Sequence, residues 1–153
     1  MRDDLFFAGI DCGATKVMVQ SSILDDRSNK ITPDKFQKEY FYSDHEKWKV
    51  DFIPKSLADQ KIEYSDDNIC LTDTEINQGN VIIEIVNKAI SDINNHNIGL
   101  CFPGIKNKDG IVIMANGPRI PDFKNRVKKI DAIYNDSDCC VIGEWRSTIG
   151  KLQ

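Results

Sequence analysis

Two apolar runs near the amino terminus predict a β-hairpin. Residues 5–10 are rich in Leu, Phe and Ile, and residues 17–23 alternate weakly between apolar and polar side chains. The polar segment 11–16 separates these runs, as a turn separates two antiparallel strands. The polar stretch 25–35 predicts the turn that leaves the hairpin, and the aromatic and polar residues 36–43 predict a third, edge-like strand.

Residues 72–94 show the clearest helical pattern. Thr72-Asp73-Thr74-Glu75 has the spacing of a capping box. An apolar stripe then follows at helical intervals, formed by Ile76, Ile83, Val86, Ile90 and Ile93. We therefore expect a helix that packs on a core and carries no chemistry.

The second half of the chain alternates short strands with helices. Residues 98–102 are nearly all apolar and precede Pro103-Gly104, which is typical of a strand buried on both faces. The pair Asp109-Gly110 predicts the turn of a hairpin over 105–114. Helices are predicted from Pro121 onward and over 139–149, ended by Gly150, with a very short strand at 132–134 between them.

Residues 45–68 fit none of these patterns. Pro54 and scattered charges predict an irregular insertion with short local elements, and such a long loop is either functional or mobile. The two histidines, His45 and His96, have no nucleophile near them in the sequence and are assigned to the surface.

Length and charge favour a single-domain protein that neither binds nucleic acid nor spans a membrane. A chain of 153 residues with 41% apolar residues can form one domain with its own core. The net charge of −4 argues against nucleic-acid binding, so the basic cluster Lys124, Arg126, Lys128 and Lys129 is assigned to a solvated helix face. No apolar run approaches the length of a membrane span, and the acidic start does not resemble a secretory signal.

The cysteines indicate a reducing compartment. They stand at positions 12, 70, 101, 139 and 140, an odd number at spacings that suit neither a disulfide framework nor a zinc site. Three of them lie in or beside apolar runs and are expected to be reduced core residues. The cytoplasm is the simplest location.

The turn of the first hairpin combines residue types that suit a phosphate site. Gly13 would let the backbone approach an anion and present its N–H groups, and Thr15 adds a hydroxyl donor. Asp11, at the end of a buried strand, could hold a Mg²⁺ ion or its water shell. The alternative is an ordinary hairpin in which Gly13 supplies a positive φ and Asp11 caps the turn.

A second acid stands between a strand and a helix. Asn135 and Asp136 follow the strand predicted at 132–134, at the kind of sheet edge where α/β folds bind ligands. Asp136 is therefore a candidate general base toward a hydroxyl that Asn135 would position. The alternative is that Asp136 or Ser137 caps the helix. Because Asp11 also ends a strand, we expect Asp11 and Asp136 to face a common cleft.

Four segments, in this order, resemble the ROK (repressor/kinase) and glucokinase branch of the actin-like ATPase superfamily. Asp11-x-Gly13-x-Thr15-Lys16 is similar to its first phosphate motif, and Gly99-x-x-x-Pro103-Gly104 followed by a hairpin resembles its sugar-side loop. Asn116 before Gly-Pro resembles a sugar-contacting asparagine. The segment from Asn135-Asp136 to Gly143-Glu144 resembles the "ND…GE" segment that leads into a helix.

The resemblance implies a fold and a reaction. The fold would be an α/β RNase H-like domain over residues 1–153, a mixed five-stranded sheet flanked by helices, forming the sugar-side half of a hexose or N-acetylhexosamine kinase. Asp136 would accept the proton of the attacking sugar hydroxyl, and Asp11 would act through Mg²⁺. The resemblance also implies the binding residues: Gly104, Asn116 and Asn135 for the sugar, and Gly13, Thr15 and Lys16 for the phosphates of ATP.

The sequence also departs from that family. Ala14 stands where the family usually has a second glycine. Residues 45–68 are longer than the corresponding connection in the family. The second phosphate loop, the adenosine site and the zinc-binding motif of the family are missing from this sequence. A nucleotide held from one side stays exposed to water. We therefore expect this chain alone to phosphorylate nothing at a useful rate, and a second domain or chain to complete the site. A homo-oligomer is a separate possibility.

Two other functions remain open. Small RNase H-like nucleases also begin with a strand that ends in an Asp-x-Gly turn, and residues 144–148 faintly resemble a segment of the Holliday-junction-resolvase-like group. Such nucleases need several carboxylates that converge on metal ions, and no acid follows Glu144. The other function is a non-catalytic sugar-binding or interaction module. No helix-turn-helix precedes the domain, so a repressor role is not expected.

Overall fold

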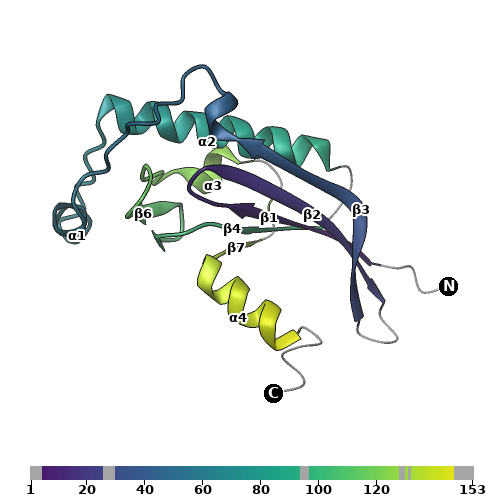
Figure 1. Cartoon of the computed structure of the whole chain (residues 1–153). Coiled ribbons are helices and arrows are strands. Elements are labelled where there is room, and N and C mark those ends of the chain that lie inside the picture. Colours follow the sequence, from purple (N-terminus) through teal and green to yellow (C-terminus); the bar gives the residue numbers. More distant parts are fainter. Residues whose placement is uncertain (1–4, 26–29, 94–96, 128–129, 131, 147–153) are drawn as a thin grey trace.

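A five-stranded mixed sheet forms the centre of the chain (Figure 1). The structure is a computed structural model that describes residues 5–25, 30–93, 97–127, 130 and 132–146. The strand order is β3-β2-β1-β4-β7. Three strands form an antiparallel meander: β1 (Leu5–Cys12), β2 (Lys16–Asp25) and β3 (Lys30–Phe41). β4 (Asn97–Cys101) runs parallel to β1, and β7 (Ala132–Tyr134) runs parallel to β4.

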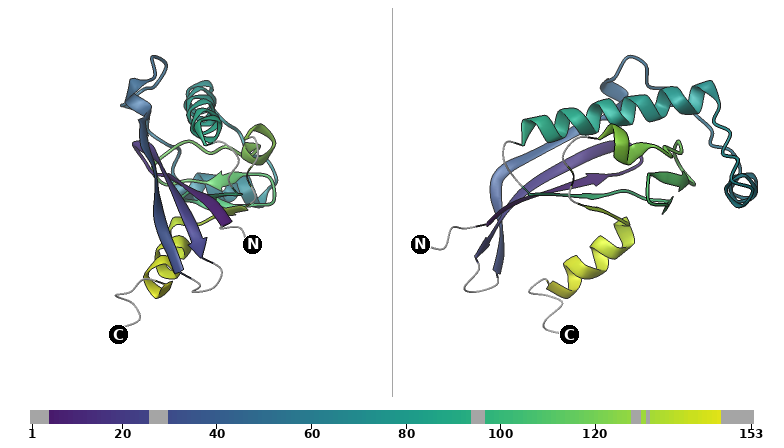
Figure 2. Two further views of the ribbon diagram at one scale, coloured as in Figure 1. Left: turned by 90° about the vertical axis from the view of Figure 1, so that its right-hand side faces the viewer. Right: turned by 180° about the vertical axis from the view of Figure 1, so that it is seen from behind.

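Helices lie on both faces of this sheet, which confirms the predicted α/β class (Figures 1 and 2). α2 (Asp73–Asp92) covers one face, and α4 (Asp136–Arg146) lies on the other. Between α2 and the sheet, apolar side chains of β1, β2 and β4 form the core, including Ile10, Val17 and Leu100. Among the described residues, no helix has the length and apolar character that crossing a membrane requires.

The helix predicted at 72–94 is confirmed as α2, with one correction to its apolar stripe. Thr72 caps it, because Thr72 Oγ1 accepts a hydrogen bond from the Glu75 N–H at 3.1 Å. Ile83, Val86, Ile90 and Ile93 are buried as predicted, but Ile76 is 42% exposed. The polar side chains of Glu75 and Gln78 occupy the buried face of this first turn instead.

Several predicted boundaries were wrong. β3 begins at Lys30, inside the stretch predicted as a turn, because it pairs with β2 as an exposed edge strand that shows no apolar alternation. The helix after Pro121 is a short α3 (Phe123–Arg126). α4 begins at Asp136, not at Cys139, since the Cys139 N–H donates to the Asn135 carbonyl at 3.1 Å. Residues 149 and 150 lie outside the described residues, as do His96, Lys128 and Lys129.

The predicted hairpin over 105–114 is confirmed as a small separate sheet. It consists of β5 (Ile105–Lys106) and β6 (Ile111–Ile113). Asn107 Oδ1 accepts hydrogen bonds from the N–H groups of Asp109 and Gly110, both at 2.9 Å, and so holds the turn. Gly104, just before β5, has a φ of +91°, and a Cβ there would lie 2.5 Å from the Ile113 carbonyl oxygen, so only glycine fits.

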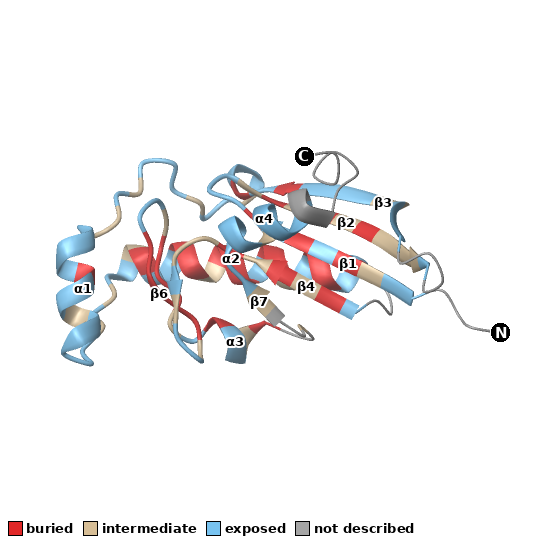
Figure 3. Cartoon of the chain, turned by 90° about the horizontal axis from the view of Figure 1, so that it is seen from below, coloured by how far each residue is buried: buried red, intermediate tan, exposed pale blue. Residues whose placement is uncertain are grey.

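The insertion contains more regular structure than its sequence pattern predicted. A short 3₁₀ turn, η1 (Tyr42–Asp44), precedes it, and a nine-residue helix, α1 (Leu57–Ser65), lies within it. α1 projects from one end of the molecule and is mostly exposed (Figure 3). His45, which was assigned to the surface, is partly exposed at 21%, and its Nε2 lies 2.9 Å from the exposed Glu84.

Gln60 is the buried residue of α1, and it anchors the insertion to the hairpin. Its Nε2 donates to the Met114 carbonyl at 2.9 Å, and its Oε1 accepts from the Met114 N–H at 2.8 Å. These bonds satisfy both backbone groups of a buried residue, which would be costly to leave unpaired. The insertion therefore fixes the start of the loop that carries Asn116.

A buried arginine fixes the other end of that loop. Arg119 is 1% exposed, and its guanidinium binds both carboxylate oxygens of Glu75, at 2.8 and 3.0 Å. It also donates to Glu63 of α1 at 2.6 Å and to the Cys70 carbonyl at 3.1 Å. Glu63 in turn binds Lys55. This network joins α1, α2 and the loop before α3.

The network makes the stability of the fold depend on acid pH. Hydrogen bonds from Arg119 and Lys55 lower the pKa of Glu63 from 4.5 to about 2. Because the pKa is lower in the folded state, the stabilisation is complete above 4.5 and is lost as the pH falls toward 2. We expect the free energy of unfolding in urea to fall over this range in the wild type and to fall less in Glu63→Gln. Parallel curves for the two proteins would contradict this assignment.

Candidate functional site

The carboxyl ends of three parallel strands meet at one edge of the sheet. Asp11 of β1 is paired in register with Cys101 of β4, and Cys101 with Tyr134 of β7. Each strand then leaves the sheet toward a segment that the sequence singled out, at Gly13, Gly104 and Asp136 respectively. This is the edge at which open α/β sheets bind ligands.

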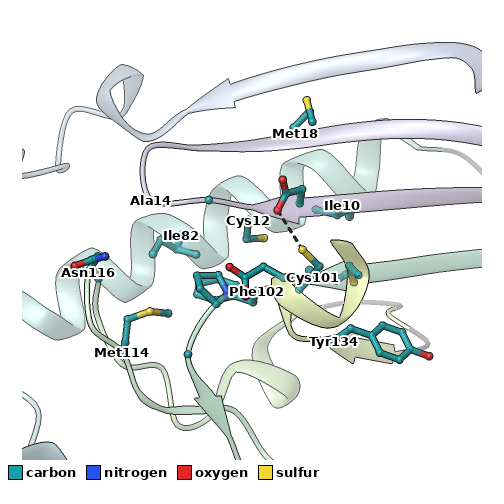
Figure 4. A pocket seen from close by; sticks show the side chains of 18 of the residues that line it. Ile10, Cys12, Ala14, Met18, Ile82, Cys101, Phe102, Met114, Asn116 and Tyr134 are labelled. Atoms are coloured by element: carbon teal, nitrogen blue, oxygen red, sulfur yellow. Dashed lines mark hydrogen bonds between the residues drawn. The ribbon is translucent and has the colours of Figure 1, made fainter. Parts of the chain in front are cut away.

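A cleft of about 870 Å³ opens at this edge (Figure 4). The two acids expected to share a cleft, Asp11 and Asp136, both line it. Gly13, Gly104 and Asn116 line it as well. The remaining lining is mainly apolar and aromatic, including Ile10, Met18, Trp48, Ile82, Phe102 and Met114. A few polar groups in a mainly apolar wall are typical of small-molecule sites.

The other predicted site residues lie outside this lining. Lys16 Nζ forms an ion pair with Glu39 of β3 at 2.5 Å and lies 5.6 Å from the ring centre of Phe41. The carbonyl of Thr15 accepts a hydrogen bond from the Tyr42 N–H at 3.0 Å, and the Thr15 side chain is exposed. Asn135 directly precedes α4 next to Asp136. Their binding roles stay predictions.

The ordinary-hairpin interpretation of the first turn expected a positive φ at Gly13, and this expectation is wrong. The φ of Gly13 is not positive, and a Cβ there would meet only the Lys16 carbonyl oxygen at an ordinary 3.5 Å, so the hairpin itself does not require glycine. Its N–H closes the hairpin by donating to that oxygen at 2.9 Å. The N–H groups of Ala14 and Thr15 have no acceptor within the described chain and are the donors that remain for an anion.

Asp11 receives a hydrogen bond from a thiol. Cys101 Sγ donates to Asp11 Oδ1 at 3.1 Å (Figure 4). Burial, and then the bond to Asp11, raise the pKa of the Cys101 thiol well above its usual range, so the thiol keeps its proton and remains a donor. Asp11 Oδ2 has no hydrogen-bond partner in the part of the chain that the structure describes. One carboxylate oxygen is thus available to a ligand.

The donors around Asp11 fit one kind of metal site. The described residues include no group of three or more His, Cys, Asp or Glu side chains placed to hold a metal ion. Mg²⁺ that binds phosphate needs only one or two protein carboxylates and keeps several waters. Asp11 alone therefore suits a phosphate-bound Mg²⁺ ion.

Asp136 partly serves its own helix. Its Oδ1 accepts a hydrogen bond from the N–H of the next residue, Ser137, at 2.9 Å. This is not the bond of an N-cap, which an N–H two or three residues further on would donate, and Asn135 holds the N-cap position because its carbonyl accepts the first helical bond. The Oδ2 atom of Asp136 has no such partner among the described residues. The bond from Ser137 and ligand binding are therefore compatible, because each uses a different oxygen.

Sequence patterns missed two contributions to the site. The rings of Tyr42 and Trp48 pack against each other with their centres 4.8 Å apart, and both residues line the cleft. The Tyr42 hydroxyl also supports the first turn, because it donates a hydrogen bond to the Gly13 carbonyl at 3.2 Å. Lys106 of β5 binds the side chain of Asn135. Lys106 belongs to no sequence motif, and Asn135 lies 29 positions from it in the sequence. No local sequence pattern could therefore have predicted this contact.

Cys12 is the cysteine that fits the predicted core role, because it is fully buried. Cys101 and Cys139 are half-buried and Cys140 is exposed, and these three line the cleft together with Cys12. Cys70 is exposed between the insertion and α2. All five are free thiols.

Comparison with solved structures assigns the fold. Over 95% of its length the chain superimposes on 50% of an inorganic polyphosphate/ATP-glucomannokinase from Arthrobacter sp. strain KM, with a TM-score of 0.55 and 15% identity. It also covers 38% of a PPX-GPPA enzyme from Aquifex aeolicus, with a TM-score of 0.39 and 13% identity. The chain spans about half the length of the glucomannokinase and has the architecture of one half of the actin-like ATPase fold. The sequence matches no protein-family model and no curated protein.

Proposed function

We propose that this chain is the sugar-binding half of an ATP-dependent hexose or N-acetylhexosamine kinase of the ROK and glucokinase type. The observation that carries the proposal is the shared cleft, where Asp11 and Asp136 come together from strands more than a hundred positions apart. The fold of the glucomannokinase half supports it. Gly13 adds support, because it faces the cleft although the hairpin does not require glycine there.

The proposed chemistry divides the cleft into two sides. On one side, Asp136 accepts the proton of the attacking sugar hydroxyl through its free oxygen, while Gly104 and Asn116 of the lining hold the sugar together with Asn135, which stands next to the lining residue Asp136. Phosphoryl transfer requires little more of the protein than this positioning and the neutralisation of charge.

The other side receives the phosphates of ATP. The free N–H groups of Ala14 and Thr15 face the anion, with Thr15 Oγ1 and Lys16 completing the predicted set. Asp11 would hold Mg²⁺, which neutralises phosphate charge when it is bound. Because the chain corresponds to half of the glucomannokinase, we propose that a second domain or chain supplies the remaining nucleotide contacts, and that the isolated chain binds sugar without efficient turnover.

Sugar titration tests this function. We expect glucose, mannose or N-acetylmannosamine to bind saturably by calorimetry, with or without Mg-ATP. Asn116→Ala should weaken that binding about tenfold, the effect of one or two lost hydrogen bonds. Asn125→Ala is the matched control, because Asn125 is exposed on α3 outside the cleft lining and should bind sugar as the wild type does.

The alternatives give different results in the same experiment. Sugar binding that persists without turnover after a nucleotide-binding half is supplied would favour the non-catalytic module. Cleavage of branched DNA without sugar binding would favour the nuclease. That nuclease needs carboxylates that converge on metal ions. The described residues include no group of three such side chains, and the side chain of Glu144 is not among the parts that the structure describes.

A further inference from the structure

Lys106 connects the small hairpin sheet to the main sheet at the edge of the cleft. It lies on β5, and its Nζ donates to the Gly104 carbonyl at 3.0 Å and to Asn135 Oδ1. Gly104 and Asn135 are the residues that precede the hairpin and α4, and both are proposed sugar contacts. One ammonium group therefore joins two parts of the proposed sugar site, the loop between β4 and β5 and the residue between β7 and α4.

The bond to Lys106 determines how the Asn135 amide is oriented. An ammonium group only donates hydrogen bonds, so the amide atom that faces it must be the carbonyl oxygen Oδ1. The NH₂ group then points away from Lys106 with two donors for other partners. Asn135 thus presents donors beside Asp136, whose free carboxylate oxygen is an acceptor. A sugar hydroxyl needs this combination, because it accepts one hydrogen bond and donates another.

Partial burial of Lys106 strengthens its hydrogen bonds, although it also makes the charged form of its amine less stable. Its side chain is half-buried, and this burial lowers its pKa, while the negative charge of Asp136 acts in the opposite direction. Hydrogen bonds from a charged donor are stronger than neutral ones, especially away from bulk water. Lys106 is therefore better placed to hold an amide than a fully solvated surface lysine.

We propose that Lys106 is a positioning residue that holds the Asn135 side chain and the Gly104 carbonyl in the geometry that binds a sugar hydroxyl. The sugar-binding part of this inference rests on the proposed function, but the amide orientation does not. Lys106 acts through Asn135, so the effect of removing Lys106 should depend on whether Asn135 is present.

The first test needs no sugar. Lys106→Met keeps the length of the side chain and removes the donor, and it should shift the Asn135 side-chain NH₂ resonances in the ligand-free protein. Lys106→Arg, which can still donate to both oxygens, should largely retain them. Lys108→Met is the matched control, because Lys108 is exposed on the same hairpin outside this contact. Unchanged Asn135 resonances in Lys106→Met would overturn the proposal even if the wild type bound sugar well.

The second test measures hexose affinity in a double-mutant cycle. We expect Lys106→Met to weaken hexose binding about tenfold, as the loss of a charge-assisted bond would, and Lys106→Arg to recover most of it. Asn135→Ala combined with Lys106→Met should lose less affinity than the sum of the two single losses, because only the bond from Lys106 to the Gly104 carbonyl is left to lose when Asn135 is absent. Additive losses would overturn the positioning role. If the wild type bound no hexose, the proposed function would fail, and the amide resonances would still decide the role of Lys106. If Lys106→Met did not fold, Lys106→Gln would be measured in the same way.

Discussion

Asp136→Asn should reduce phosphoryl transfer to a sugar by about 10²- to 10⁴-fold, the usual contribution of a general base. The assay requires the chain supplied with a nucleotide-binding half and Mg-ATP. Sugar affinity should change little, because an amide of the same shape can still bind a hydroxyl. α4 should also remain, since asparagine can accept the Ser137 N–H bond that the carboxylate accepts now. The expected pattern is a fall in kcat at nearly constant sugar Kd.

Asp138 provides the matched control for this variant. It is another acid in the first turn of α4, it is exposed, and it does not line the cleft. Asp138→Asn should therefore turn over like the wild type. Turnover that survived in Asp136→Asn would show that Asp136 is not the base. An equal loss in both variants would show that the charge of the helix start matters and not the proton acceptor.

Arg119→Met should lower the free energy of unfolding by about 3–5 kcal/mol, the cost of removing one partner from a buried ion pair. The loss arises because Glu75, which is 2% exposed, would keep a charge with no counter-ion. Urea unfolding near neutral pH measures the effect. Replacing both Arg119 and Glu75 by methionine should cost less than Arg119→Met alone, because no unpaired charge would remain at Glu75.

Arg126→Met is the control for the arginine variant. Arg126 lies 3.6 Å from Asp122, and its side chain is 34% exposed. Partly solvated pairs of this kind contribute about 1 kcal/mol or less. If Arg119→Met were no more damaging than Arg126→Met, the buried network would not be what holds the insertion to the fold.

The elements that sequence patterns predicted are those with local signals. The first hairpin, α2 and the turn at Asn107–Gly110 each follow from residues within a few positions of one another. The stretch 30–35 has no such signal, and the helix at 57–65 has only its cap, where Ser56 Oγ accepts a hydrogen bond from the Asp59 N–H at 3.2 Å. The edge strand has solvated side chains and needs only a backbone partner. The short helix is held by distant partners, through the buried side chain of Gln60 and the ion pair of Glu63 with Arg119.

The residues of the candidate site could likewise be predicted only where a local sequence pattern marks them. Asp11 and Asp136 could be predicted because each ends an apolar strand, and parallel strands bring such ends together. Lys106 and Arg119 could not be predicted. Their partners lie 29, 44 and 56 positions away, and nothing in a polar residue's local sequence indicates that folding will bury it beside a distant oxygen.

The anchoring of Met114 and Arg119 has a consequence for how this protein can vary among its relatives. Gln60 and Glu63, both on α1, hold the two ends of the loop that carries Asn116. A homologue that lost α1 would need new bonds for the Met114 backbone and a second acid for the guanidinium. The length of residues 45–70 and the shape of the loop around Asn116 should therefore have evolved together.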